Sequence, residues 1–414
     1  MENSIIYNAA EYKRRFKDSD CRMKQVRGTH KQEYEVYPKV TAVAPGRFHL
    51  IGEHSWFFRD KTLSMAVNLP VYVSVSKRDD SVLKFYFSQM NERKRANLSS
   101  LKFRREDRWA NAIKAVISGF LSGGCTLGGM NITVYSDILP SAGFGITTAI
   151  KAASALAFRE LFSLGISDEE VLQAIARGNK SFLKTGNYNA DNFAALYSKA
   201  GKLLITDHAR ASYDYVDFPF DDSLVLLTDA RVPRVSVWDE NTIHESENAL
   251  LLGDLRERKK GVYGGWQYEN NVTEINETLS AVNEDTRRKL LCIMREHNDV
   301  IDAREALVKN DFGTFARAVN HSHESMRDLF EISCPEIDWI LKRVGELEPN
   351  LEQLRNPVTC GRITGKGFGR CLYTFIRKED EEAFRTKLSE YERIFGFHPS
   401  SYRVQPADGA HIVK

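Results

Sequence analysis

At roughly 100–200 residues per domain, the 414 residues of the chain allow two or three domains. With 42% hydrophobic and 28% charged residues, the composition is typical of a folded globular protein and excludes a disordered or collagen-like chain. The 58 Lys and Arg residues and the 56 Asp and Glu residues leave a net charge of +2, which gives no sign of a nucleic-acid partner.

The six cysteines are scattered, with no C-x-x-C pair and no histidine at zinc-site spacing. This pattern argues against a disulfide framework and a structural metal. His321 and His323, two residues apart, are interpreted as structural histidines rather than metal ligands. The N-terminus lacks the basic and apolar regions of a secretion signal, and no apolar run approaches the roughly 18 residues that span a membrane. We therefore expect a cytoplasmic protein without a membrane partner.

Two alternating or aromatic-rich runs, 71–76 and 82–87, predict strands that form a hairpin or meander. A third alternating run, 130–136, predicts another strand. It leads into the turn-rich stretch 140–145 and then into a predicted helix that contains Thr148. This region therefore has the order strand, glycine-rich loop, helix.

Ser167 and Glu170 have the spacing of a capping box, which marks the start of a helix. Strand-like runs at 203–206 and 224–229 then precede a long region of helical patterns, residues 246–341. We place a change of domain near these two strands.

The end of the chain returns to a mixed pattern. The glycine-rich segment 361–369 is followed by a predicted strand at 371–376 and a charged predicted helix at 379–394. Helices and strands are therefore expected on both sides of the change of domain.

Two glycine-rich segments are candidates for phosphate binding: Gly143-Phe-Gly-Ile-Thr-Thr before a predicted helix, and Gly365-Lys-Gly-Phe-Gly before a predicted strand. Glycine lets backbone N–H groups approach an anion, and a helix N-terminus adds the positive end of its dipole. Hydroxyls at Thr147 and Thr148 are placed to reach a phosphate or its metal. Neither segment has the spacing of a Walker A loop or a dinucleotide fingerprint, and tight turns use the same residues. A phosphate loop and a plain turn both stay open.

A third segment, 44–55, concentrates ionisable side chains in apolar surroundings: Arg47, His49, Glu53 and His54. A buried strand avoids such groups unless they have partners. A binding or catalytic site therefore explains the segment better than a plain strand does. The structural alternative is an ion pair between Arg47 and Glu53.

Segment 44–57, Ala-Pro-Gly-Arg-Phe-His-Leu-Ile-Gly-Glu-His-Ser-Trp-Phe, resembles the motif A-P-G-R-V-N-L-I-G-E-H-T-D-Y of the galactokinases, a branch of the GHMP kinases. Residues 108–117 resemble a second galactokinase motif, R-W-A-N-Y-V-K-G-V-I. Residues 322–338 resemble S-H-x-S-L-R-D-x-Y-x-V-S-C-P-E-L-D, and residues 362–371 resemble R-M-T-G-G-G-F-G-G-C. The four motifs occur in the galactokinase order, so the resemblance extends over nearly the whole chain.

The resemblance implies the fold class α+β, in the form of the two-domain GHMP kinase fold. Its N-terminal α/β domain would comprise residues 1–215, and its ferredoxin-like C-terminal domain residues 216–414. In this family the active site lies in the cleft between the two domains.

The resemblance also implies an ATP- and Mg²⁺-dependent enzyme that transfers the γ-phosphoryl group to a sugar hydroxyl, the anomeric one in galactokinases. Asp191 matches the aspartate that takes or orients the sugar proton, and Arg47 matches the arginine that supports its charge. Glu53 and His54 match sugar-hydroxyl ligands. The implied partners are a small-molecule sugar and ATP, with no obligate protein partner.

For the nucleotide, the resemblance assigns phosphate contacts to the two glycine-rich loops. The residues concerned are Gly143, Gly145, Thr147, Thr148, Gly365 and Gly367. Thr147 takes the place of a magnesium-binding serine. Trp109 takes the place of a residue that flanks the adenine, although a tryptophan on a helix is more often a core residue.

Several ligand positions of the family carry other residue types here. Trp56 stands where an aspartate binds sugar hydroxyls, and Tyr188 where a glycine meets the sugar, which predicts an altered pocket for galactose or a related sugar. Asn179 stands where a glutamate binds magnesium, and Ala112 where an aromatic residue lines the base. The resemblance therefore places the metal ligands at Thr147 and Asn179. Because Asn179 keeps an oxygen but not the charge that a hard dication favours, we expect metal binding to weaken unless another carboxylate substitutes.

Three functions follow from these observations. A sugar kinase of galactokinase type is the leading hypothesis, because Arg47, Glu53, His54 and Asp191 all persist. A catalytically weak or inactive homologue that binds a sugar or nucleotide as a sensor or regulator is the main alternative. A GHMP kinase that acts outside sugar metabolism is the third.

Overall fold

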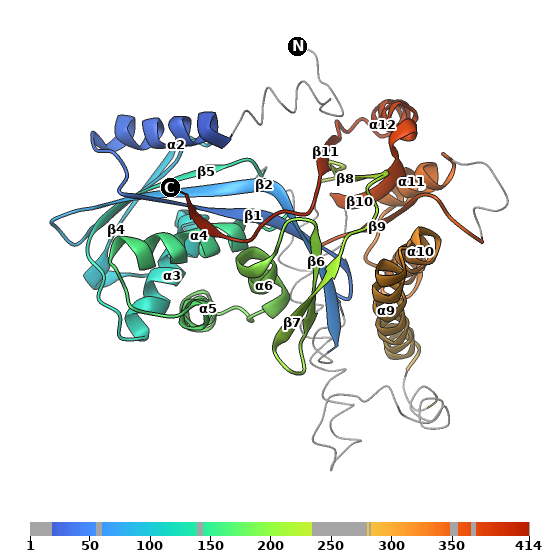
Figure 1. The fold of residues 1–414 in the computed structure, drawn as a ribbon, viewed down its shortest axis with the longest axis horizontal. Coiled ribbons are helices and arrows are strands. Elements are labelled where there is room, and N and C mark those ends of the chain that lie inside the picture. Colours follow the sequence, from blue (N-terminus) through green and yellow to red (C-terminus); the bar gives the residue numbers. More distant parts are fainter. Residues whose placement is uncertain are drawn as a thin grey trace. The chain divides into compact units, whose positions relative to one another are not determined.

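The computed structural model of the chain describes residues 19–54, 60–138, 144–233, 280, 283–347, 355–365 and 370–413 (Figure 1). The chain divides into two compact units, neither of which is continuous in sequence. The N-terminal unit takes its described residues from Tyr7–Phe48, Ser64–Leu204 and Val404–Lys414. The C-terminal unit takes them from His49–Leu63 and Ile205–Arg403. The predicted division into residues 1–215 and 216–414 stays a prediction about domains.

The N-terminal unit is built on a sheet with the strand order β12-β1-β2-β5-β3-β4. These strands are β1 (Val40–Ile51), β2 (Lys61–Lys77), β3 (Val82–Phe87), β4 (Glu92–Asn97), β5 (Met130–Ser136) and β12 (His411–Val413). Figure 1 shows helix α2 on one face of the sheet and helices α3 to α6 on the other. Because both faces are covered, β5 is buried along its whole length.

The helices of this unit include those on which the candidate site depends. They are α2 (Ser19–Tyr34), α3 (Ala110–Ser122), α4 (Ile146–Leu161), α5 (Asp168–Arg177), the π-helical turn η4 (Gly178–Leu183) and α6 (Asn189–Tyr197). The capping box predicted for α5 is confirmed, because Glu170 N donates to Ser167 Oγ at 3.2 Å and Ser167 N donates to Glu170 Oε2 at 2.8 Å. The remaining short turns are the 3₁₀ helices η2 (Leu98–Ser100) and η3 (Arg105–Asp107).

The strands predicted at 82–87 and 130–136 coincide with β3 and β5, but the predicted hairpin is wrong. Strand β5 lies between β2 and β3, antiparallel to β2 and parallel to β3. The connection after β2 is bound to Gly129, since Arg78 N donates to Gly129 O at 3.0 Å and Gly129 N donates to Asp80 O at 3.1 Å. A Cβ atom at Gly129 would lie 2.1 Å from Asp80 O, so only glycine lets β5 enter at this point.

The C-terminal unit contains a second sheet of order β11-β8-β10-β9, in which β10 is antiparallel to β8 and to β9. Its strands are β8 (Ser223–Asp229), β9 (Cys360–Ile363), β10 (Cys371–Arg377) and β11 (Ser400–Val404). Its helices are α9 (Glu284–Lys309), α10 (Phe312–Asp328), α11 (Pro335–Gly345), the 3₁₀ turn η6 (Lys378–Asp380) and α12 (Glu381–Phe395). Strands β6 (Lys202–Asp207) and β7 (Ser212–Asp217) belong to the first sheet, in which β6 pairs with β2 and with β7.

The core of the C-terminal unit joins its sheet to α9, α10, α11 and α12. Its fully buried members include Leu226, Cys292, Met326, Ile337, Leu372 and Leu388. Cys334 is partly buried and packs against this core. The strands predicted at 224–229 and 371–376 lie within β8 and β10, and the predicted charged helix corresponds to α12. In the predicted helical region, residues 246–279 lie outside the described residues.

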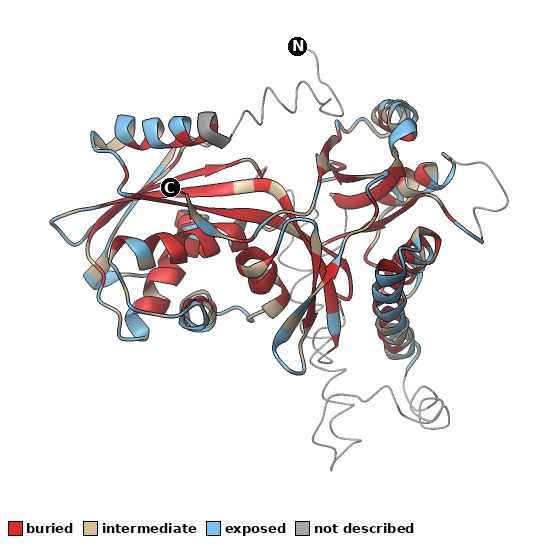
Figure 2. Cartoon of the chain, in the orientation of Figure 1, coloured by how far each residue is buried: buried red, intermediate tan, exposed pale blue. Residues whose placement is uncertain are grey.

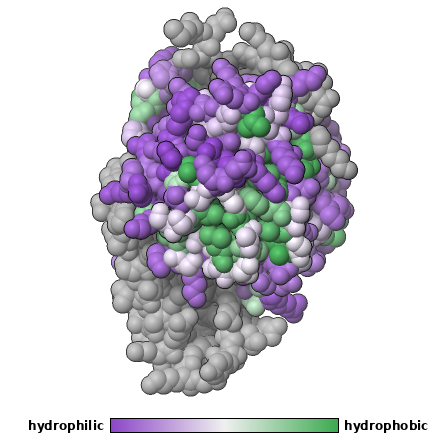
Figure 3. Space-filling model, turned by 90° about the vertical axis from the view of Figure 1, so that its left-hand side faces the viewer, coloured by the Kyte–Doolittle hydropathy of each residue, from purple (hydrophilic) through white to green (hydrophobic). Residues whose placement is uncertain are grey.

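Burial follows the two sheets, whose strands are mostly buried while the helices keep exposed outer faces (Figure 2). On the face viewed in Figure 3, hydrophobic residues gather beside hydrophilic ones. Large apolar side chains exposed in the N-terminal unit are Val36, Tyr37, Phe103 and Leu121. Among the described residues, none of the helices combines the length and the apolar character that crossing a membrane requires.

Candidate functional site

The N-terminal unit brings Arg47 and Asp191 together, although 144 positions separate them in the sequence (191 − 47). Arg47 projects from β1 and Asp191 from the first turn of α6, and Arg47 Nε lies 2.7 Å from Asp191 Oδ1. The two side chains are 12% and 23% exposed, so the ion pair is largely withdrawn from water. The alternative pairing of Arg47 with Glu53 is wrong, because Glu53 pairs with Arg362.

The loop before α4 is tied to this ion pair. Arg47 N donates to Phe144 O at 3.0 Å. Gly145 has a φ of +79°, and a Cβ atom there would lie 3.0 Å from Arg47 Cγ, so conformation and space both favour glycine. Thr148 Oγ1 donates to Asp191 Oδ2 at 3.4 Å, whereas Thr147 is exposed in the same helical turn. The structure thus gathers Arg47, Gly145, Thr148 and Asp191, while Gly143 lies outside the described residues.

Lys151 follows Thr148 by three residues and therefore lies on the same side of α4. It is only 9% exposed, and its Nζ donates to Asn179 Oδ1, in the turn η4, at 2.9 Å. Burial lowers the pKa of Lys151, while the charge of Asp191 raises it and that of Arg47 lowers it. Sequence reasoning missed this residue, although a lysine within the apolar run Ile150–Phe158 of a helix was the signal that would have found it.

A chain of amide groups fixes the orientation of Asn179. Its Nδ2 donates to Asn187 Oδ1 at 3.1 Å, and Asn192 Nδ2 donates to the same oxygen at 2.9 Å. Asn187 Nδ2 in turn donates to Asn189 Oδ1 at 2.8 Å. Because its amide nitrogen faces Asn187, the oxygen of Asn179 must face Lys151.

A protein-held magnesium ion does not fit the residues at this position. The oxygen of Asn179 already accepts a hydrogen bond from an ammonium group, whose positive charge would repel a dication. The described residues also contain no group of three or more His, Cys, Asp or Glu side chains that could hold a metal ion. Thr147 alone offers a single neutral oxygen.

Two further predicted site residues of the N-terminal unit are described, Trp109 and Tyr188. Trp109 is half-buried, its Nε1 donates to Glu92 Oε2 at 3.0 Å, and its ring meets Phe87 edge-on at 5.2 Å between centroids. Trp109 is therefore held by β3 and β4. Tyr188 is half-buried and occupies the N-cap of α6, three residues before Asp191.

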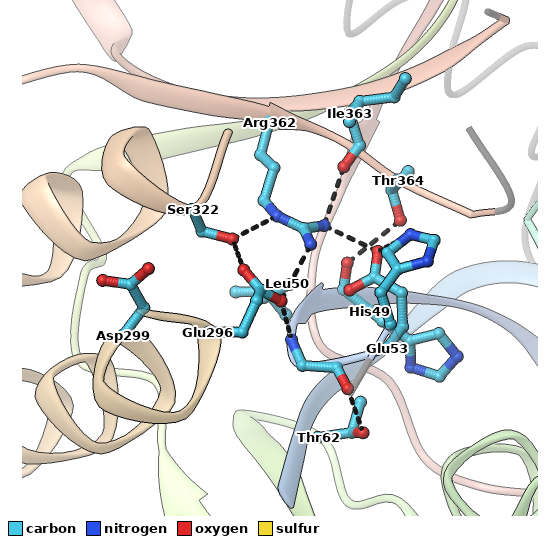
Figure 4. A network of polar contacts seen from close by, with 12 residues as sticks. His49, Leu50, Glu53, Thr62, Glu296, Asp299, Ser322, Arg362, Ile363 and Thr364 are labelled. Carbon is cyan, nitrogen blue, oxygen red and sulfur yellow. Dashed lines mark hydrogen bonds and ion pairs between the residues drawn. The ribbon is translucent and has the colours of Figure 1, made fainter. Parts of the chain in front are cut away.

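In the C-terminal unit, Glu53 is held by an arginine that is fully buried (Figure 4). Arg362 Nη1 donates to Glu53 Oε1 at 2.7 Å, its Nε to Ser322 Oγ at 2.6 Å and its Nη2 to Glu296 Oε2 at 3.3 Å. Burial works against the charged guanidinium, but the carboxylates of Glu53 and Glu296 raise the pKa of Arg362 above its usual range. Glu53 Oε2 is buried and has no hydrogen-bond partner among the described residues.

Two consecutive residues of α9 hold both ends of the connection from β1 to β2. Gly52 N donates to Glu296 Oε2 at 2.9 Å, and His297 Nδ1 lies 2.9 Å from Asp60 Oδ1. Gly52 has a φ of +94°, and a Cβ atom there would lie 2.2 Å from Lys61 O. Glu296 and Arg362 thus position Glu53, and His297 holds Asp60; sequence reasoning missed these roles. Only contacts between distant segments reveal them.

His54, predicted as a sugar ligand, packs its ring against Phe330 at 5.3 Å between centroids. Gly365 follows β9 with a φ of +82°. Trp56 and Gly367 lie outside the described residues. His321 and His323 contact different carboxylates, Asp299 at 2.7 Å and Asp338 at 3.3 Å, as expected of structural histidines.

Comparison with protein families gives three matches along the chain. A galactokinase galactose-binding signature matches residues 28–77, a GHMP kinase N-terminal domain matches residues 110–199, and a GHMP kinase C-terminal domain matches residues 303–393. The three matched ranges contain or overlap all four motif segments, the last two of which lie in the third range.

Individual proteins match over nearly the full length. A Treponema pallidum (strain Nichols) protein named "Putative galactokinase" is 39% identical over 395 residues, 95% of this chain and 97% of that protein. A Streptococcus thermophilus galactokinase is 24% identical over 394 residues, 94% of this chain and 99% of that protein. The crystal structure of Lactococcus lactis galactokinase complexed with galactose has the same fold, with a TM-score of 0.83 at 18% identity over 94% of this chain and 99% of that one. A Methanococcus jannaschii mevalonate kinase is a more distant fold match, with a TM-score of 0.60 at 14% identity over 89% of this chain and 98% of that one.

Proposed function

The chain belongs to the galactokinase branch of the GHMP kinases, and from this membership we propose that it transfers the γ-phosphoryl group of ATP to the anomeric hydroxyl of galactose or a related sugar. The observation that carries the proposal is the ion pair between Arg47 and Asp191, 2.7 Å long and largely withdrawn from water beside the loop at Gly145. A partly buried carboxylate with a cation and a hydroxyl donor beside it is suited to accept or orient a proton.

In this proposal Asp191 is the catalytic base and Arg47 its electrostatic partner. Phosphoryl transfer depends on position and charge stabilisation more than on covalent chemistry. The guanidinium of Arg47 compensates the charge of ionised Asp191 and has further N–H groups to offer a transferring phosphoryl group. Thr148 adds a longer hydroxyl contact, 3.4 Å, to the second oxygen of Asp191.

Glu53 and His54 are proposed as ligands of the sugar hydroxyls. The buried, unpartnered Oε2 of Glu53 supports this role, because buried polar atoms are seldom left without a hydrogen bond. We also propose that Trp56 and Tyr188 shape the sugar pocket. These two large rings at family ligand positions favour a substrate that differs in part from galactose.

The nucleotide would contact Trp109 and the residues of both glycine-rich loops: Gly143, Gly145, Thr147, Thr148, Gly365 and Gly367. ATP is the phosphoryl donor of the family, and we propose that Mg²⁺ arrives bound to it, since Asn179 adds no free ligand. We further propose a cytoplasmic enzyme without an obligate protein partner. An inactive sensor is not favoured, because Arg47 and Asp191 remain paired.

The test is ATP consumption by the purified chain with Mg²⁺ and galactose, galactosamine, arabinose, fucose, glucuronate or inositol. Asp191→Asn should lower turnover at least roughly 100-fold, the lower end of the usual contribution of a general base. Asp214→Asn, an exposed position on β7, is the matched control and should keep full turnover. A folded Asp191→Asn variant with unchanged turnover would contradict the assignment. Silence of the wild type across the panel, with a thermal shift on adding sugar, would favour the sensor instead.

A further inference from the structure

We propose that Lys151 is a phosphate-binding residue, and that its ammonium group stands where the family places a protein-held divalent cation. The inference rests on the proposed function for the identity of the anion, the polyphosphate of the nucleotide. Its basis is the buried ammonium group of Lys151, for which the described residues provide no carboxylate partner.

The two buried lysines of the described chain differ in their partners. Lys114, 1% exposed, pairs with the carboxylate of Asp107 and donates to Lys102 O at 3.2 Å. Lys151, 9% exposed, donates to the neutral amide oxygen of Asn179 and lies within ion-pair distance of no carboxylate of the described residues. Burying a lysine is costly unless an anion compensates it. Lys114 has its anion within the fold, whereas the described residues provide none for Lys151.

The neighbouring charges also favour a negatively charged ligand. Asp191 is compensated by Arg47 at 2.7 Å, and both groups act on Lys151 electrostatically. Together, the three described residues Asp191, Arg47 and Lys151 carry one carboxylate and two cations, an excess of one positive charge. An ammonium group has three donors, of which Asn179 takes one and the described residues leave two. A phosphoryl oxygen is an acceptor that satisfies such donors.

Asn179 supports the cation instead of competing with it. The amide chain through Asn187 fixes its oxygen toward Lys151, so this side chain orients the ammonium group without neutralising it. A carboxylate at the same position would form an ion pair with Lys151 and withdraw its charge from a ligand. A neutral side chain such as Asn179 is a poor magnesium ligand. It leaves the charge of Lys151 available for an external anion.

The direct test is calorimetric binding of inorganic tripolyphosphate, ATP and adenosine to the full chain in EDTA. Lys151→Met should weaken tripolyphosphate and ATP at least ~10-fold, equivalent to about 1.4 kcal/mol, and leave adenosine unchanged. Lys151→Arg should retain most of the affinity. Arg159→Met removes a cation of the same helix that pairs with exposed Asp168, and it should bind like the wild type. Methionine suits the buried apolar helix, and circular dichroism with the melting temperature checks that each variant is folded.

A second variant separates the lysine from a metal site. Asn179→Asp should weaken tripolyphosphate in EDTA, because the new carboxylate neutralises Lys151. Tighter binding of that variant in Mg²⁺ without a loss in EDTA would overturn the inference, and so would unchanged affinities in folded Lys151→Met. If the wild type phosphorylates no sugar but Lys151→Met still loses tripolyphosphate, the proposed function fails while this inference stands. If the wild type phosphorylates a sugar and Lys151→Met binds tripolyphosphate as tightly as the wild type, this inference fails while the proposed function stands.

Discussion

Asp299 is a single buried carboxyl group whose protonation makes stability depend on pH. Its Oδ1 lies 2.7 Å from His321 Nδ1, and its Oδ2 is buried without a hydrogen-bond partner among the described residues. Burial raises the pKa of Asp299 to about 7, the charge of Glu296 adds to the shift, and His321 and Arg362 oppose it. Since the ordinary value is 3.8, the folded chain keeps a proton that the unfolded chain releases between these values. The contribution to stability is full below the unfolded pKa and is lost as the pH rises through about 7.

Asp299→Asn should remove this dependence. The free energy of unfolding of the variant, minus that of the wild type, should rise with pH by at most about 1.4 kcal/mol per pH unit across this window. Urea unfolding at several pH values between roughly 4 and 8 measures it. His30, whose pKa burial lowers to about 4, has the opposite pH dependence but cancels in the difference. Parallel stability curves for the two proteins would show that Asp299 is ionised throughout.

At the scale of residues, the sequence identifies the charged groups but not all of their partners. Arg47 and Glu53 are conspicuous because ionisable groups are dense in one apolar segment. The partners of such groups follow only from the fold. Arg362 lies 309 positions from its partner Glu53, and Lys151 lies 28 positions from its partner Asn179. Spacing along a helix or strand predicts only which neighbours share a face. Contacts across such separations require the packed structure.

At the scale of elements, two glycines let helices approach closely enough to place Asn179. A Cβ atom at Gly178 would lie 2.2 Å from Ala115 O of α3, and one at Gly119 of α3 would lie 1.9 Å from Ala174 O of α5. The turn η4 therefore lies against α3 with backbone nearly in contact with backbone. Its place decides where the oxygen of Asn179 meets Lys151.

Gly178→Ala should push η4 away from α3 and disturb that contact. We expect a loss of stability of about 1–3 kcal/mol, typical of overpacking, together with weaker tripolyphosphate binding. Thermal unfolding and calorimetry measure the two effects. Gly165→Ala is the matched control, because a Cβ atom there meets nothing within 4 Å. Equal stability and equal tripolyphosphate binding of the two alanine variants would mean that η4 tolerates displacement from α3.

Secondary structure was more accessible from the sequence than strand pairing. The aromatic-rich run gave the bounds of β3, the alternating run gave those of β5, and the capping box gave the start of α5. The predicted hairpin of 71–76 with 82–87 failed because β5, more than forty positions after β3 begins, is inserted between them. Alternation records which side chains are buried, and a buried strand gives the same pattern beside either neighbour. The close approach of Gly129 to Asp80, which lets β5 enter beside β3, depends on a single residue that alternation does not register.

At the scale of the whole molecule, the end of the described chain belongs to the N-terminal unit. Residues 411–413 pair with residues 41–43 of β1 at the edge of the sheet. Gly409 N donates to Ser198 O and Ala410 N donates to Ala195 O, each at 2.8 Å, which ties the same segment to the end of α6. Because α6 carries Asp191, residues near opposite ends of the sequence support one candidate catalytic group.

A chain ending at Val404 should therefore lose order in the N-terminal unit first. Removing β12 leaves the edge of β1 unpaired, and it frees the two carbonyl groups at the end of α6 from their donors. Amide hydrogen exchange should become faster in β1 and α6, and turnover should fall, because Asp191 loses its fixed place. Amides of β8 and β10, which pair within the C-terminal unit, are the internal reference and should keep their protection. Unchanged exchange in β1 and α6 would show that the sheet and α6 hold Asp191 without the terminal segment.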